Sequence, residues 1–151
     1  MRVLYVDDDR IHALLFAEAC RSLGPEPVEI ETADSGHEAL ALAASWQPDL
    51  LLLDLHLPDT LGTDLLPALR ATLKRPDLPA WLCSADDSQA VTDAAMAAGF
   101  DRCWPKPVDV PRMVVALQTL AVRLSGDSRD NGFIRDDGDI RDNGDNGVCS
   151  A

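Results

Sequence analysis

The stretch that decides the fold of this chain is Leu50-Leu51-Leu52-Leu53-Asp54-Leu55-His56-Leu57-Pro58-Asp59. Its four consecutive leucines do not alternate with polar residues, and this pattern is typical of a parallel strand covered on both faces. The run ends at a carboxylate. In open parallel sheets, ligands bind beyond the carboxyl ends of the strands. Asp54 is therefore the first candidate for a functional residue.

Strand-like and helix-like segments alternate along the first 124 residues. Strands are predicted at residues 2–6, 27–31, 49–53, 80–83 and around 102–104. Ser35 and Glu38 match the capping-box pattern at the start of the second helix. The helices are predicted from apolar residues at three-to-four spacing: Ile11, Leu14 and Leu15; Leu65, Leu66, Leu69 and Leu73; Val91, Ala94, Ala95 and Ala98; and Val114, Leu117, Leu120, Ala121 and Leu124. Five strand–helix pairs predict an α/β fold with a parallel sheet and helices on both faces.

Composition restricts the functions that this chain could have. It has 26 acidic and 13 basic residues, a formal net charge of -13, so binding to a nucleic-acid backbone is not expected. The four cysteines and three histidines lack zinc-site spacing. The apolar runs are too short to span a bilayer and no signal peptide is recognisable, which makes the cytoplasm the expected location.

The composition changes at residue 125. Residues 125–151 form an acidic segment in which Arg-Asp-Asn/Asp-Gly recurs every six residues. Its few apolar residues cannot offset the entropy lost on ordering, so the sequence predicts a disordered tail after a single domain at residues 1–124. The repeat matches neither of the common calcium-binding patterns, because its period differs and the distal Glu is missing.

Polar residues stand at the carboxyl ends of four predicted strands, where they would meet at one edge of the sheet: Asp7, Asp8 and Asp9; Asp54; Ser84; and Lys106. Clustered carboxylates repel one another, and a divalent cation with oxygen ligands, such as Mg²⁺, would relieve that repulsion. Asp9 is interpreted as a helix N-cap or a carboxylate of the first helical turn. A carboxylate, a cation, a hydroxyl and a lysine together suit phosphoryl transfer, in which positioning and charge neutralisation do most of the catalysis.

These positions resemble the motifs of response-regulator receiver domains from bacterial two-component systems. The resemblance covers about residues 1–124 and is carried by Asp7-Asp8, residues 51–59, Leu82-Cys83-Ser84-Ala85 and Lys106-Pro107. It implies a flavodoxin-like, doubly wound sheet of five parallel strands in the order 2-1-3-4-5, with five helices.

The same resemblance implies a role for each site residue. Asp54 would be phosphorylated, while Lys106 and Ser84 would hold the phosphoryl group. Asp8 and Asp54 would ligate Mg²⁺ directly, Asp7 would act through water, and the backbone carbonyl of His56 would be a further ligand. The Lys106-Pro107 peptide would be cis. The implied partner is a histidine kinase or histidine phosphotransferase, with output by protein contact and without turnover of an external substrate.

One position departs from the receiver pattern. Receivers commonly carry Tyr or Phe three residues before the lysine, and here that residue is Cys103. Trp104 is adjacent, but alternation along a strand would point it to the opposite face. We expect phosphorylation to survive this change. The signal would then pass through Ser84, the loop after it and the fourth helix, or be read directly at the site.

Two other readings remain open. A degenerate receiver would act as a docking module without phosphorylation, and Cys103 is the main reason to consider it. A haloacid-dehalogenase-like phosphatase would use Asp7 and Asp9 as its Asp-x-Asp motif. That reading leaves Asp54 without a role and requires an acidic pair on a further strand, whereas Lys106 leads directly into the last helix.

Overall fold

The computed structural model describes residues 1–22 and 24–126. It contains five strands, β1 Arg2–Val6, β2 Glu29–Ala33, β3 Leu50–Asp54, β4 Ala80–Ser84 and β5 Arg102–Pro105. They alternate with five helices, α1 Arg10–Ser22, α2 Gly36–Ala43, α3 Gly62–Leu73, α4 Gln89–Ala98 and α5 Val110–Gly126. No helix within these residues is long and apolar enough to cross a membrane.

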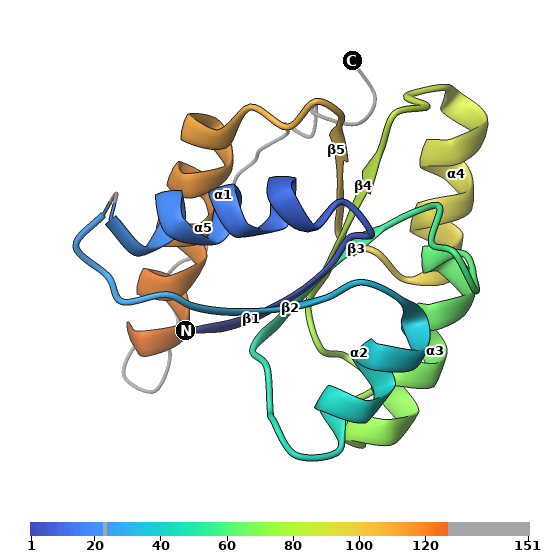
Figure 1. Cartoon of the computed structure of the whole chain (residues 1–151), viewed down its shortest axis with the longest axis horizontal. Coiled ribbons are helices and arrows are strands. Elements are labelled where there is room, and N and C mark those ends of the chain that lie inside the picture. Colours follow the sequence, from blue (N-terminus) through green and yellow to red (C-terminus); the bar gives the residue numbers. More distant parts are fainter. Residues whose placement is uncertain (23, 127–151) are drawn as a thin grey trace.

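All five strands are parallel and lie in the order β2-β1-β3-β4-β5, as the sequence predicted. Helices α1 and α5 cover one face of the sheet, and α2, α3 and α4 cover the other (Figure 1). Each face has its own core, and the central strand contributes to both. Leu51 and Leu53 point to the three-helix side, Leu50 and Leu52 to the two-helix side, and all four are fully buried. Burial on both faces explains the unbroken leucine run.

The second strand lies two residues later than predicted. Pairing of β2 with β1 begins at Glu29, whose N–H donates to the Met1 carbonyl, and continues to Ala33, whose carbonyl accepts from Asp7 N–H. Pro27 has no N–H to donate, and its carbonyl accepts a 3.0 Å hydrogen bond from the amino group of Met1, so the strand pairing begins at Glu29, opposite the first residue of β1. The last residue of β2 is therefore hydrogen-bonded to Asp7, the first residue of the acidic run Asp7-Asp8-Asp9.

The apolar face predicted for the first helix is wrong. The side chains of Ile11, Leu14 and Leu15 are 72%, 64% and 66% exposed. The buried face consists of Ala13, Phe16, Ala17 and Cys20, which have the same spacing in a different phase. Packing decides between the two phases, because the Phe16 ring meets the Tyr5 ring edge-on at 5.0 Å. In α5 the predicted stripe is largely buried, but Leu124 is 39% exposed.

The domain boundary predicted at residue 124 falls inside α5, which runs through Gly126. The predicted acidic tail lies almost wholly outside the described residues, which end there.

The loop between β3 and α3 is fastened to the start of α2. Asp59 accepts hydrogen bonds from Gly36 N and His37 N, each of 2.9 Å. Ser35 Oγ accepts a 3.1 Å hydrogen bond from Glu38 N, as the capping-box pattern predicted. The Glu38 side chain, however, accepts from Asp34 N, one residue before the N-cap residue Ser35. These bonds satisfy N–H groups that would otherwise be orphaned at the helix start. They also hold the segment that follows Asp54.

Candidate active site

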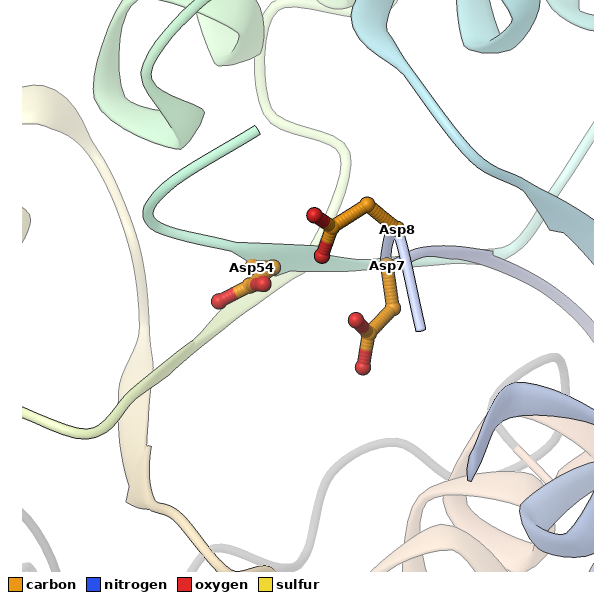
Figure 2. A group of neighbouring side chains, drawn as sticks. All are labelled: Asp7, Asp8 and Asp54. Carbon is orange, nitrogen blue, oxygen red and sulfur yellow. The ribbon is translucent and has the colours of Figure 1, made fainter. Parts of the chain in front are cut away.

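Three carboxylates meet at the carboxyl edge of the sheet (Figure 2). The register pairs Val6 of β1 with Leu53 of β3, so Asp7 and Asp54 follow side by side. One oxygen from each of Asp7, Asp8 and Asp54 lies within 4.8 Å of the others. Asp7 and Asp54 are buried, whereas Asp8 is exposed. The ends of β1 and β3 therefore bring three carboxylates together, and the cluster reaches solvent at Asp8.

Asp7 is held by the protein at both carboxylate oxygens. Its Oδ1 accepts a 3.0 Å hydrogen bond from Asp9 N, and its Oδ2 accepts a 2.8 Å bond from the Tyr5 hydroxyl. His12 Nδ1 lies 3.3 Å from the same Oδ2. Burial raises the pKa of the Asp7 carboxyl, but these hydrogen bonds and the charge of Lys106 outweigh it and hold the pKa below its usual value. Asp7 therefore stays ionised although its side chain is not exposed.

Lys106 places an ammonium group between two of the carboxylates. Its Nζ lies 3.2 Å from Asp54 Oδ2 and 3.4 Å from Asp7 Oδ2. Burial lowers the pKa of Lys106, but the charges of Asp54 and Asp7 raise it further, and the net shift is upward. The following peptide, Lys106-Pro107, is cis, as the family resemblance implied.

The pKa of Asp54 is raised, in contrast to that of Asp7. Burial is the largest cause, and the charges of Asp7 and Asp8 add to it, while the nearby Lys106 ammonium opposes both. The Lys106 ammonium therefore does not offset the combined effect of burial and the two neighbouring carboxylates on the pKa of Asp54. A cation placed among them would favour the ionised form of Asp54.

Ser84 and His56 both stand at the carboxyl ends of strands, Ser84 as the last residue of β4 and His56 two residues after the end of β3. Ser84 ends β4, next to β3, and its buried Oγ accepts a 3.0 Å hydrogen bond from Asp86 N. His56 is exposed and pairs with Leu61 in an isolated bridge. The two hydrogen bonds of that bridge involve Leu55, Leu57, Thr60 and Gly62, and neither uses the His56 carbonyl.

The carboxylate cluster fits a magnesium ion. Mg²⁺ binds oxygen ligands at about 2.1 Å in an octahedron, so ligands on opposite sides lie about 4.2 Å apart. The three oxygens, all within 4.8 Å, need only small movements to reach that geometry. The donor set, which is entirely carboxylate, also suits a hard cation.

Sequence reasoning missed two residues of the site, Tyr5 and His12. Tyr5 lies two residues before Asp7 on the same strand, and the two side chains therefore share a face. That alternation could have identified Tyr5. His12 is brought to Asp7 by the first turn of α1, where Asp9 acts as the N-cap and accepts a 3.0 Å hydrogen bond from His12 N. Trp104 and Cys103 face opposite sides of the sheet, as predicted.

The chain matches known proteins over the part that holds this site. Residues 3–118 match the family model of the response regulator receiver domain. TcrX of Mycobacterium tuberculosis, a probable transcriptional regulatory protein, is 35% identical over 130 residues, covering 86% of this chain and 53% of that protein. The response regulator MprA of Mycobacterium avium is 36% identical over 123 residues, covering 82% and 52%. The chain thus spans about half the length of these curated relatives.

Solved structures agree with the sequence matches. The receiver domain of the Francisella response regulator 1452 has a TM-score of 0.71 and 26% identity, covering 82% of this chain and 98% of that one. A receiver domain protein of Methanospirillum hungatei, described as CheY-like, has a TM-score of 0.72 and 25% identity, covering 83% and 97%.

Proposed function

The chain belongs to the response-regulator receiver family of two-component signalling, and from that premise we propose that it accepts a phosphoryl group on Asp54 in the presence of Mg²⁺. One observation carries the proposal. The Asp54 carboxylate lies 3.2 Å from the Lys106 ammonium and has an oxygen within 4.8 Å of oxygens of Asp7 and Asp8, an acidic pair able to hold a cation. Receivers that have lost this chemistry would be expected to lack one of these charges, and this chain retains them all.

The chain's own residues support an in-line displacement. A carboxylate oxygen of Asp54 attacks phosphorus, a new Asp54 O–P bond forms, and the bond from phosphorus to the donor's leaving atom breaks. Lys106, now 3.2 Å from Asp54 Oδ2, is close enough to contact an oxygen of the transferred group. The Ser84 hydroxyl still has its proton to donate, because its present bond from Asp86 N uses only the oxygen.

The metal would be held by Asp8 and Asp54, with Asp7 through water and the carbonyl of His56 as a further ligand. When bound, Mg²⁺ neutralises charge on the phosphoryl oxygens and on the carboxylates. The hydrogen bonds to Asp7 support this division of roles. Its Oδ2 is engaged by Tyr5, His12 and Lys106, whereas its Oδ1 accepts a single hydrogen bond, from Asp9 N, and would have a lone pair left for a metal-bound water.

The phosphoryl donor in this proposal is a histidine kinase or a histidine phosphotransferase, since receiver domains are substrates of histidine kinases. We further propose that the chain acts as a stand-alone regulator in the cytoplasm, signals by protein contact and turns over no external substrate. The curated relatives are about twice as long, so the same domain also occurs with a further region attached.

Intact-mass measurement after incubation with acetyl phosphate and Mg²⁺ tests the proposal. We expect wild type and Asp86→Asn to gain one phosphoryl group, Asp54→Asn to gain none, and the adduct to disappear when Mg²⁺ is omitted. Asp86→Asn is a matched control because Asp86 is exposed and lies in the neighbouring loop. No adduct on wild type, together with no binding of beryllofluoride, would favour the docking-module reading. An adduct on Asp54→Asn would point to Asp7 or Asp9, as in the phosphatase reading.

A further inference from the structure

A groove runs along α5 at the β5 edge of the sheet. It is formed by α5, by β5 and by residues of and before β4, and its volume is about 720 Å³. It extends from Asp77 and Asp101, at the amino ends of β4 and β5, to Arg112 in the first turn of α5, and it is lined by none of Asp7, Asp8, Asp54, Ser84 and Lys106. It is therefore separate from the phosphoryl-transfer chemistry.

On its α5 wall the groove has an arginine near each end and apolar side chains between them, while Asp77 and Asp101 also line it. Arg112 and Arg123 lie on one face of α5, eleven residues and so about 16 Å apart. Among the described residues, neither guanidinium group makes an ion pair or a hydrogen bond. Between them lie Val115, which is 64% exposed, and the half-buried Ala116 and Leu120. Two arginines without a carboxylate partner are unexpected in a chain with twice as many acids as bases.

The chain itself continues from the end of this groove. Arg123 lies one helical turn before Gly126, where the described residues end, and 25 residues follow. Part of their sequence is complementary to the α5 wall of the groove. The apolar pair Phe133-Ile134 lies between Asp130 on one side and Asp136-Asp137 on the other. The six steps from Asp130 to Asp136 span about 20 Å in an extended chain, close to the separation of the two arginines.

We propose that residues 130–137 of this chain dock in its own groove, antiparallel to α5. Asp130 then pairs with Arg123, Phe133 and Ile134 cover Val115 and Leu120, and Asp136 pairs with Arg112. The contact needs little intrinsic affinity, because a short tether gives an effective concentration in the millimolar range. Docking does not require the tail to form a hydrophobic core of its own, so it agrees with the few apolar residues of residues 125–151. The docked segment would cover this face against other partners.

Hydrogen exchange of the full-length protein, followed by mass spectrometry, tests the docking. The six-residue repeat supplies an internal control, since residues 141–146 resemble residues 135–140 in composition but lack the preceding apolar pair. We expect amides of residues 130–137 to exchange about two- to tenfold more slowly than those of residues 141–146 in wild type. High salt should reduce that difference.

Charge variants identify the surface. Arg112→Glu with Arg123→Glu should abolish the protection, whereas Arg10→Glu with Arg21→Glu, an equal charge change on exposed positions of α1, should preserve it. Pairing Arg112→Asp with Asp136→Arg should restore part of it. Unchanged exchange in β1 and α1 would show that each variant is folded. The proposal is overturned by equal exchange throughout residues 127–151, by protection that survives the Arg112/Arg123 variant, or by protection that grows with protein concentration, which would indicate a second copy as the occupant.

Discussion

The hydroxyl of Tyr5 donates a 2.8 Å hydrogen bond to Oδ2 of Asp7, the residue that directly follows β1. Both side chains are buried, and the Asp7 side chain has no exposed surface. A buried carboxylate is costly unless hydrogen bonds and nearby positive charge compensate it. Tyr5 therefore helps to keep a charged residue inside the fold at the point where the candidate site needs it. Burial and the neighbouring acids in turn raise the pKa of the Tyr5 phenol, which keeps it a donor.

Tyr5→Phe should destabilise the metal-free protein by about 1.5–3 kcal/mol, the usual contribution of a hydrogen bond to a charged group. Urea unfolding at pH 7 measures this loss. In the Asp7→Asn background the same substitution should cost clearly less, because the charge that the hydroxyl stabilises is gone. An equal cost in both backgrounds would mean that the hydroxyl acts on another group.

Gly62→Ala should be more damaging than Gly36→Ala, although both residues begin a helix. A Cβ on Gly62 would lie 2.5 Å from the backbone carbonyl oxygen of Asp54, which cannot move without shifting the site. A Cβ on Gly36 would meet side-chain atoms alone, the Thr60 methyl group at 2.6 Å and Asp59 Oδ1 and Leu65 Cδ1 at 3.4 Å. We expect a loss of about 1–3 kcal/mol for Gly62→Ala, together with slower acetyl-phosphate labelling. Similar unfolding curves for the two variants would show that α3 can move freely at this point.

The sequence was sufficient to predict the sheet and the chemistry-bearing residues because both depend on local signals. Four leucines followed by Asp54 indicate burial on both faces, and each charged site residue ends a strand or lies within two residues of a strand's end. The phase of α1 could not be predicted in the same way. Two apolar sets, one containing Leu14 and one containing Phe16, have equal spacing, and only the contact between Phe16 and Tyr5 in the folded protein decides which set is buried. The contacts of His12 with Asp7 depend on the same long-range packing.

Asp54→Asn should stabilise the protein when Mg²⁺ is absent. Burial, with the charges of Asp7 and Asp8, raises the pKa of Asp54 above its unfolded value, so ionisation of Asp54 at neutral pH reduces stability. A neutral amide of the same shape removes that cost. We expect the melting temperature at pH 7 to rise by roughly 4 °C, equivalent to about 1 kcal/mol. A fall in melting temperature would show that the attraction to Lys106 outweighs the repulsion and burial.

Mg²⁺ should reverse the difference in melting temperature between wild type and Asp54→Asn. A ligand that binds only the folded state stabilises it by RT ln(1 + [L]/Kd), and wild type offers one carboxylate more than Asp54→Asn. The melting temperature of wild type should therefore rise with Mg²⁺ concentration more steeply than that of the variant. Asp77→Asn, which changes an exposed carboxylate at the other end of the sheet, should respond as wild type does. Equal responses of wild type and Asp54→Asn would argue against Asp54 as a ligand.

Asp59 should make the stability of the domain depend on pH in the acid range. Hydrogen bonds from Gly36 N and His37 N lower the pKa of its carboxyl below the unfolded value of about 3.9. The unfolded state then binds the proton more readily. The stabilisation is therefore fully present above about pH 4 and is lost as the pH falls through the folded pKa.

In Asp59→Asn, the amide keeps one acceptor oxygen but not the charge, so stability should be lower at pH 6. The difference from wild type should shrink as the pH falls toward 2. Urea unfolding of both proteins across that range, with Asp77→Asn as a surface control, measures the effect. A pH-independent difference would mean that Asp59 stabilises the start of α2 by geometry and not by charge.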